Sequence, residues 1–448
     1  MAAIFPLSLD HSDSIMTNNI LIIGSGGREH ALGWKAAQNP SVDTVFVAPG
    51  NAGTQTEPKM RNIDIDILDF AKLTDFAKIN HVSLTIIGPE VPLVEGIVDA
   101  FEAQGLACFG PSKGAAQLEG SKEFTKDFLA RHNIPTGSYK SFSDTDEAIA
   151  YIHEQGAPIV VKADGLAAGK GVIVAMDEQT AIDAVRDMLS GNAFGEAGCR
   201  VVIEEFLDGE EASFIVIADG EHALPMATSQ DHKRAGNGDT GLNTGGMGAY
   251  SPAPVVTPEV YDRVMSEVIM PTIKGMASEG NPYTGFLYAG LMIDKTGAPK
   301  VIEYNCRFGD PETQPIMMRL QSDLVELCHA ALDKTLSTKT TQWDERPAVG
   351  VVLAAGGYPG SYAKGDVISG LDVADSAIAK VFHAGTKCNA QGDVTTNGGR
   401  VLCATALGAN VTEAQANAYE QARKVTWNNV YLRDDIAYRA IEREAQKV

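Results

Sequence analysis

Lysine and arginine are absent from the first 27 positions of this 448-residue chain. A secretory leader needs a basic start and a transit peptide needs arginines, so neither targeting segment fits. The longest apolar run, residues 348–357, is far shorter than the roughly 18 residues of a membrane-spanning helix. We therefore expect a cytoplasmic protein with no membrane partner, and a disordered N-terminal extension over residues 1–19.

Several catalytic and structural signatures are also missing. The six cysteines form no CxxC pair, which favours reduced thiols over a disulfide framework. No HExxH motif and no Cys/His cluster with metal spacing occurs, and the sequence does not indicate a covalent nucleophile.

Positive charge is scarce. Lys and Arg number 36 against 58 Asp and Glu, a net charge of −22, which disfavours nucleic acid and anionic membranes as partners. If the chain handles phosphates, its cations must be concentrated locally. The 44% of hydrophobic residues exclude wholesale disorder, and the length suggests about three domains. The oligomeric state stays open, and a monomer is compatible with the sequence.

The chain divides into three units. Short apolar runs at 20–23, 44–48 and 84–87, with a helical pattern between the last two, predict a doubly wound parallel-sheet α/β domain over 20–120. Residues 121–334 form the second unit, with strands at 213–218, 290–294 and 300–303 and a long helix at 258–276. Residues 335–347 are polar and are expected to be a linker. Residues 348–448 are expected to form a small, separate α+β domain, with a hairpin turn at Asn397-Gly398.

A compact α+β lobe is expected inside the second unit, at about 140–207. Its helices are predicted to be capped by Ser143 and Thr180, and its strands to lie at 159–162, 172–175 and 201–206. A glycine-rich loop at 163–171 joins the first two strands.

The first glycine-rich motif is GSGGREH, residues 24–30, after the first strand. A dinucleotide site would need a third glycine where Glu29 stands and an acid after the second strand, and both are missing. A dehydrogenase is therefore disfavoured. Backbone N–H groups at a helix start, with Arg28, suit a phosphate, although a plain strand–helix turn is the alternative.

The loop at 163–171 is not a Walker A loop, because only three residues separate Gly165 from Gly169 and glycine follows Lys170. Lys162 and Lys170 flanking such a loop suit closure over a polyphosphate. An exposed hairpin with solvated lysines is the alternative. The cationic run at 231–234 beside the glycine-rich segment 241–248 suits a second anionic substrate, or is a solvated face.

The last motif follows the strand at 300–303. Glu303 and Asn305 are two residues apart and so share one face, as hard oxygen ligands suited to magnesium. Arg307 lies two further along and can neutralise phosphoryl charge. Structural ion pairing is the alternative.

At these residues the chain resembles the ATP-grasp ligases, and among them the family that joins glycine to 5-phospho-β-D-ribosylamine in purine synthesis. The motifs that carry the resemblance are GSGGREHAL (24–32), GPEVPL (88–93), KADGLAAGKGV (162–172), EEFLDGEEAS (204–213), NTGGMGAYSP (243–252) and RFGDPETQ (307–314). The resemblance implies an ATP-grasp core with a mobile flap lobe. It also implies ATP, glycine and phosphoribosylamine as substrates, and Mg²⁺ or Mn²⁺ as the metal.

The resemblance assigns roles to residues. Arg307, Lys162 and Lys233 would be catalytic, and Glu303 and Asn305 would hold the metal. ATP would contact Lys122, Lys162, Gly169, Lys170, Gly171, Glu204, Glu205, Phe206, Leu207 and Glu211. The other substrates would contact Gly26, Gly27, Arg28, Glu29, Pro89, Glu90, Asp231, Asn243, Thr244, Gly245, Gly246, Met247, Arg307 and Asp310.

One departure stands out, because many ATP-grasp enzymes have a further metal carboxylate where this chain has Leu291. Phosphorylation of the glycine carboxylate, followed by attack of the amine, is the expected mechanism. Two rivals stay open, namely another ATP-grasp enzyme such as a carboxylase and a nucleotide-sensing module without turnover.

Overall fold

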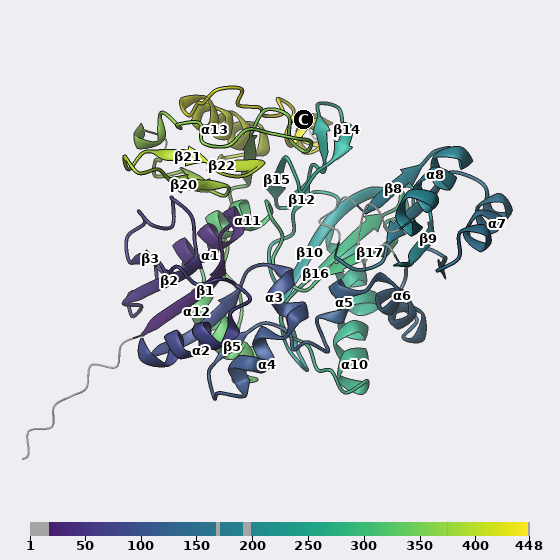
Figure 1. Ribbon diagram of the computed structural model, residues 1–448, viewed down its shortest axis with the longest axis horizontal. Helices are drawn as coiled ribbons and strands as arrows, with labels where there is room; N and C mark the ends of the chain where they lie inside the picture. Colours follow the sequence, from purple (N-terminus) through teal and green to yellow (C-terminus); the bar gives the residue numbers. More distant parts are fainter. Residues whose placement is uncertain (1–17, 167–170, 191–198, 374, 447–448) are drawn as a thin grey trace, which may run out of the picture.

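The computed structural model describes residues 18–166, 171–190, 199–373 and 375–446. Figure 1 shows the N-terminal sheet on one side, the flap lobe on the other, a central sheet between them, and the C-terminal sheet along the top. None of the described helices has the length and apolar character to cross a membrane. The expected extension at 1–19 falls almost wholly outside the described residues.

The N-terminal sheet is parallel, with strand order β3-β2-β1-β4-β5. Its strands are β1 Asn19–Gly24, β2 Thr44–Pro49, β3 Met60–Asn62, β4 Val82–Ile87 and β5 Cys108–Phe109. Its helices are α1 Gly27–Ala36, α2 Phe70–Ile79, α3 Glu90–Glu95 and α4 Ile97–Glu102. The order reverses beside β1, so the carboxyl ends of β1 and β4 meet at the position where such sheets bind ligands. The starts of α1 and α3 are thereby neighbours.

The flap lobe is an antiparallel sheet of order β6-β9-β7-β8, covered by two helices. Its elements are β6 Tyr139–Phe142, α7 Thr145–Gln155, β7 Ile159–Ala163, β8 Val172–Ala175, α8 Glu178–Leu189 and β9 Val201–Glu205. Short helices α5 Gln117–Gly120 and α6 Lys122–Arg131 lead into the lobe.

The predicted helix caps in this lobe are wrong. Asp144, not Ser143, caps α7, because its carboxylate accepts the N–H groups of residues 146 and 147. Asp177, not Thr180, caps α8, since it accepts the N–H of Thr180. In both cases a carboxylate takes the position in place of the hydroxyl chosen from the sequence pattern, and both are favoured cap residues.

The central sheet is antiparallel, with order β11-β10-β16-β17. Its strands are β10 Glu210–Asp219, β11 Ala223–Pro225, β16 Thr284–Ile293 and β17 Pro299–Asn305. The single helix expected at 258–276 is three pieces, namely α9 Pro258–Arg263, the π-turn Val264–Ile269 and α10 Met270–Ser278. Pro271 has no N–H to donate, so the α-helical ladder is interrupted at this point.

The C-terminal sheet has the order β12-β15-β18-β22-β19. Its strands are β12 Gln230–Asp231, β15 Gly248–Ser251, β18 Ala348–Ala354, β19 Ala379–His383 and β22 Arg400–Leu407. Two small hairpins accompany it, β13 Arg234–Gly236 with β14 Thr240–Asn243 and β20 Thr386–Cys388 with β21 Val394–Thr396. The remaining helices are α11 Thr313–Arg319, α12 Leu324–Leu332, α13 Val411–Lys424 and α14 Tyr438–Gln446, with short 3-10 turns at Leu336–Thr338 and Leu371–Val373.

Two expectations for this region need correction. Strands β12 and β15 come from the second unit, so the C-terminal sheet is not confined to residues 348–448. Asn397-Gly398 is not a hairpin turn, because β21 pairs with β20 while β22 pairs with β18 and β19. The N–H of Asn397 instead donates to the carbonyl of Gly385.

The expected linker at 335–347 packs against the rest of the fold, because Leu336 is buried and Trp343 forms a β-bridge with Leu320.

Candidate active site

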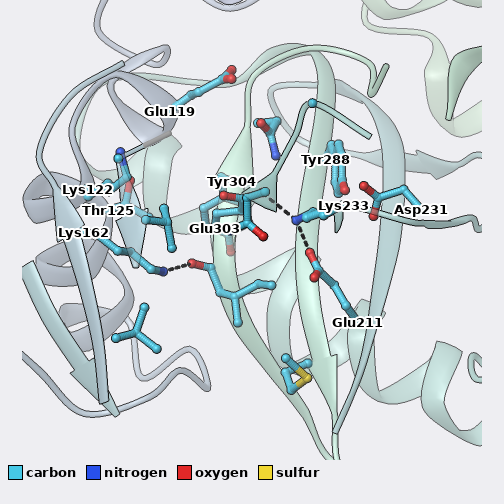
Figure 2. A pocket seen from close by; sticks show the side chains of 18 of the residues that line it. Glu119, Lys122, Thr125, Lys162, Glu211, Asp231, Lys233, Tyr288, Glu303 and Tyr304 are labelled. Atoms are coloured by element: carbon cyan, nitrogen blue, oxygen red, sulfur yellow. Dashed lines mark hydrogen bonds and ion pairs between the residues drawn. The ribbon is translucent and has the colours of Figure 1, made fainter. Parts of the chain in front are cut away.

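A cavity of about 790 Å³ lies where the N-terminal sheet, flap lobe, central sheet and C-terminal sheet meet. Figure 2 shows Lys122 and Lys162 on one side of it, and Glu211, Asp231 and Lys233 on the other. Twenty residues assigned from the sequence line it: Arg28, Pro89, Glu90, Lys122, Lys162, Gly171, Glu204, Glu205, Phe206, Leu207, Glu211, Asp231, Lys233, Asn243, Thr244, Gly245, Glu303, Asn305, Arg307 and Asp310.

Five assigned residues do not line this cavity: Gly26, Gly27, Glu29, Gly246 and Met247. Glu29 is buried and holds the loop closed, since its carboxylate accepts the N–H of Gly26 and pairs with Arg28 at 2.5 Å. Met247 is fully buried in the core of the C-terminal sheet. Gly169 and Lys170 lie outside the described residues.

Gly26 and Gly27 instead line the close approach of α1 to the start of α11. A Cβ on Gly27 would stand 2.5 Å from the amide nitrogen of Gln314, and one on Gly26 would meet Glu29 at 2.7 Å. Gly246 has φ +115°, which favours glycine, and a Cβ there would stand 2.4 Å from Pro311. These three glycines shape the loops behind the lining residues.

Glu303 and Asn305 form the candidate metal pair at the end of β17. Glu303 is opposite Gly290 on β16, where a Cβ would stand 3.0 Å from the glutamate side chain, so glycine makes room for the carboxylate. Lys233 above all, with Lys162 and Lys122, lowers the pKa of Glu303 to about 2, against the opposing effect of desolvation. An ionised carboxylate and an amide oxygen on one face suit Mg²⁺ or Mn²⁺ that keeps other oxygen ligands.

No group of three or more His, Cys, Asp or Glu side chains that could hold a metal occurs among the described residues. The residues present therefore fit an ion that relies on other oxygens, such as those of a nucleotide. Leu291 is fully buried in the core and adds no ligand at the position where many ATP-grasp enzymes have one.

Lys233 lies among carboxylates. Its ammonium pairs with Glu211 and stands 3.4 Å from Glu303 (Figure 2). Burial works against its charge, but Glu211, Glu303 and Asp231 together raise the pKa of Lys233 well above the ordinary value. Burial raises the pKa of Asp231 well above its usual range, against the opposing effect of Lys233. The surrounding carboxylates therefore favour the charged form of Lys233.

Lys162 joins the flap lobe to the central sheet. From β7, its ammonium donates to the carbonyl of Ile302 on β17 at 2.9 Å, the dashed line that leaves Lys162 in Figure 2. It also pairs with Glu204 on β9 at 3.0 Å. Lys122, the first residue of α6, donates to the carbonyl of Gly165 at 2.7 Å at the start of the glycine-rich loop. Burial lowers the pKa of Lys122, while Glu303 opposes the shift. Two lysines thus face Glu303 across the cavity.

Arg307 is held by carboxylates from two elements. Its Nε stands 3.2 Å from Glu90 and its Nη2 stands 3.0 Å from Glu119. Burial opposes its charge, but Glu119 and Glu90 raise the pKa of Arg307 above its ordinary value. Its plane is therefore fixed while it faces the cavity.

Arg28 and Asp310 connect the N-terminal loop to the remainder of the site. The Arg28 side chain donates to the carbonyl of Phe308 at 3.2 Å, and its backbone N–H donates to Asp310 at 3.4 Å. Burial tends to raise the pKa of Asp310, but Arg400 and Arg28 hold it below the ordinary value. This end of the cavity combines a helix N-terminus with arginine side chains, a combination that suits a phosphate.

Comparison with known proteins identifies the family. Residues 18–119, 120–313 and 348–439 match, in turn, the N domain, the ATP-grasp (A) domain and the C domain of Phosphoribosylglycinamide synthetase. The chain belongs to the phosphoribosylglycinamide synthetase family. The resemblance drawn from the sequence is thereby confirmed, as is the predicted fold class.

Relatives and solved structures agree with this membership in the phosphoribosylglycinamide synthetases. The chain is 71% identical to the phosphoribosylamine–glycine ligase of Vibrio vulnificus (strain CMCP6), covering 96% of this chain and 100% of the relative. It is 68% identical to that of Salmonella typhimurium, covering 95% and 99%. The crystal structure of the Thermotoga maritima phosphoribosylamine–glycine ligase has a TM-score of 0.80 at 33% identity, covering 94% of this chain and 100% of that one.

More distant structures share only the fold. The biotin carboxylase domain of the Hydrogenobacter thermophilus 2-oxoglutarate carboxylase has a TM-score of 0.71 at 15% identity, covering 93% of this chain and 92% of that one. As a member of the phosphoribosylglycinamide synthetase family, the chain is an ATP-grasp ligase that uses ATP.

Sequence reasoning missed several residues of this synthetase cavity. The unassigned lining side chains include Glu119, Thr125, Lys126, Tyr288, Arg400 and Arg439. Glu119 stands three residues before Lys122, and Lys126 lies one helical turn after it, so proximity to an assigned lysine could have indicated both. Arg400 and Arg439 reach the cavity only through tertiary packing, and no local pattern marks them.

Proposed function

We propose that the chain joins glycine to 5-phospho-β-D-ribosylamine with hydrolysis of ATP, giving glycinamide ribonucleotide, ADP and phosphate in de novo purine synthesis. The observation that carries this proposal is one cavity with two differently built ends. Lys122, Lys162 and Glu303 line one end, and Arg28 with the start of α1 lies at the other. Arg307 lies on the wall of the same cavity.

The reaction needs an activated carboxylate, because a free carboxylate is a poor electrophile for an amine. ATP supplies the activation by transferring its terminal phosphoryl group to the glycine carboxylate. The amine of phosphoribosylamine then attacks the glycyl carbon of this acyl phosphate, an amide bond forms, and inorganic phosphate leaves. Phosphoryl transfer depends chiefly on positioning and neutralisation of charge.

The residues divide these tasks. Lys122 and Lys162 neutralise the ATP phosphates, and the backbone of residues 204–207 contacts the adenine, with Glu211 near the ribose. Glu303 and Asn305 would hold Mg²⁺ or Mn²⁺, which supplies charge neutralisation at the phosphates when bound. Closure of the flap lobe excludes water.

The second substrate lies beside the N-terminal loop. Arg28 and the α1 N-terminus bind its phosphate, and Pro89 and Glu90 contact the sugar. Asp231 and Lys233, with residues 243–245, contact the reacting end together with Arg307. Arg307 stabilises the transferring group or the glycine carboxylate. The substrates are small molecules, and we propose that the chain works on them in the cytoplasm.

Omitting each substrate in turn tests this function. ADP release should require glycine and phosphoribosylamine together, and bicarbonate should not replace glycine. Release with bicarbonate would favour a carboxylase, and binding of ATP without turnover would favour a nucleotide sensor. Oxygen-18 placed in the glycine carboxylate should appear in the released phosphate, and its absence there would contradict an acyl phosphate.

A further inference from the structure

Glu119 is a buried carboxylate to which neither the sequence motifs nor the mechanism above gives a role. It belongs to the short helix α5, three residues before Lys122, and its side chain is 8% exposed. It lines the cavity, and Figure 2 shows it with Lys122 on the side away from Glu211 and Lys233. Burial raises its pKa to about 7, although Arg307 opposes the shift.

Both oxygens of Glu119 contact the two residues that directly follow β17. One stands 3.0 Å from Nη2 of Arg307, and the other accepts the backbone N–H of Cys306 at 2.7 Å. Cys306 separates Asn305 from Arg307. A single carboxylate therefore fixes the backbone between a candidate metal ligand and a candidate catalytic arginine, and orients the arginine head group as well.

The remaining contacts of Arg307 do not replace this one. Glu90 binds Nε at 3.2 Å from another element, and the carbonyl of Phe308 accepts from Nη1 at 3.2 Å. Of these acceptors, only Glu119 comes from the segment that continues into Lys122. Because a guanidinium presents its donors in a rigid plane, fixing Nη2 as well as Nε sets the direction in which the free N–H groups point.

We propose that Glu119 is a positioning residue for Arg307: it holds the guanidinium in the orientation that the transferring phosphoryl group or glycine carboxylate requires, and it couples this orientation to the helix that begins with Lys122. This inference rests on the proposed function. Glu119 needs no contact with substrate, since it acts through Arg307.

The test replaces Glu119 with glutamine, which keeps an acceptor for the Cys306 N–H but removes the charge that pairs with Arg307. We expect kcat/KM for glycine to fall about 10- to 100-fold, because misplacing a positioned group by about 1 Å costs on this order. The KM for ATP should change by less than about threefold. Glu279→Gln is the matched control, since Glu279 pairs with Arg131 at the surface outside the cavity.

A double-mutant cycle separates positioning from a general structural effect. In the Arg307→Lys background, Glu119→Gln should cost less than about threefold more, because the group that it positions is already lost. If Glu119→Gln fails to fold, Glu119→Asp tests the positioning in another way, since it keeps the charge but withdraws the carboxylate by one methylene from Arg307 and the Cys306 N–H.

Three results would overturn the proposal. The first is a near-normal kcat/KM for glycine in Glu119→Gln, and the second is an effect confined to the KM for ATP. The third is a fold-loss from Glu119→Gln that is as large in the Arg307→Lys background as in the unsubstituted chain. Failure of the proposed function is distinguishable from these. It would show as ADP release that does not depend on glycine and phosphoribosylamine in the unsubstituted chain and in Glu279→Gln alike.

Discussion

Replacing Lys162 with methionine removes a side chain that contacts both Glu204 of the flap lobe and the carbonyl of Ile302 in the central sheet. Methionine keeps an unbranched chain of similar length, so the substitution deletes the charge and the donors with little change of shape. Two separate effects follow, one on catalysis and one on folding.

The size of each effect follows from the contacts. Losing one preorganised donor to a developing negative charge lowers kcat by about 10²–10³-fold. The substitution also leaves one oxygen of Glu204 without its cation at 3.0 Å, in a side chain that is 5% exposed. Leaving a buried acceptor unsatisfied destabilises a fold by about 1–3 kcal/mol. The second oxygen keeps its pairing with Lys126 at 2.7 Å, which limits the loss.

Lys126→Met is the matched control. Lys126 pairs with the same carboxylate and also donates to Thr136 at 2.7 Å, and burial lowers its pKa to about 8 although Glu204 opposes the shift. We expect a comparable loss of stability, because a buried carboxylate again loses one partner, but a fall in kcat of less than about tenfold.

Steady-state ADP release and urea unfolding of both variants give the measurement. The reasoning is refuted if Lys162→Met keeps kcat within about fivefold of the unsubstituted chain, or if the two variants lose kcat equally, since a transition-state donor is worth far more than that.

Three further substitutions test other parts of the molecule. Glu303→Gln should lower turnover about 10²-fold at saturating Mg²⁺ or Mn²⁺ with an unchanged unfolding midpoint, and near-normal turnover would remove Glu303 from the metal site. Gly27→Val should raise the KM for phosphoribosylamine roughly tenfold and leave the KM for ATP unchanged. The new side chain displaces Gln314, whose amide nitrogen is 2.5 Å from a Cβ at this position. An unchanged KM for phosphoribosylamine would contradict the assigned phosphate site. Burial, with His30 and Lys380, lowers the pKa of His383 from 6.5 to about 3. Below pH 6.5 the unfolded chain therefore binds a proton at His383 that the folded chain does not bind. This histidine should lower the free energy of unfolding by about 1.4 kcal/mol per pH unit as the pH drops below 6.5. In urea unfolding, His383→Asn should make the decline in this free energy between pH 7.5 and pH 5 about 2 kcal/mol smaller. An unaltered decline would show that His383 is not buried in its neutral form.

The sequence predicts the buried strands closely because a continuous apolar run is a local signal. Residues 20–23 were expected as a strand, and β1 spans Asn19–Gly24. The expected strand at 172–175 agrees with β8. Helix caps are less predictable, since Asp144 and Asp177 compete with nearby hydroxyls for the same N–H groups. The prediction of a hairpin turn at Asn397-Gly398 is wrong because strand pairing is decided by contacts between residues that are distant in the sequence.

The residues of the candidate site likewise divide into those that a local sequence pattern indicates and those that depend on contacts distant in the sequence. Glycine loops and the Glu303/Asn305/Arg307 spacing are local patterns, so they could be found without a structure. The positioning role of Glu119 could not, because it depends on contacts with Cys306 and Arg307, which lie 187 and 188 positions further along the chain. The assigned residues Glu29 and Met247 show the opposite error, because motif membership does not distinguish a lining side chain from one that supports the loop. The site roles, like the domain boundaries, stay predictions.

The proposed function depends most on a nucleotide held between the flap lobe and the central sheet, with its metal at Glu303 and Asn305. A crystal structure with Mn²⁺ and a non-hydrolysable ATP analogue measures this directly through the anomalous scattering of manganese. The account predicts a manganese peak about 2.0–2.3 Å from one oxygen of each side chain, with the triphosphate facing Lys122 and Lys162. A peak elsewhere, or an analogue outside the cavity, would contradict it.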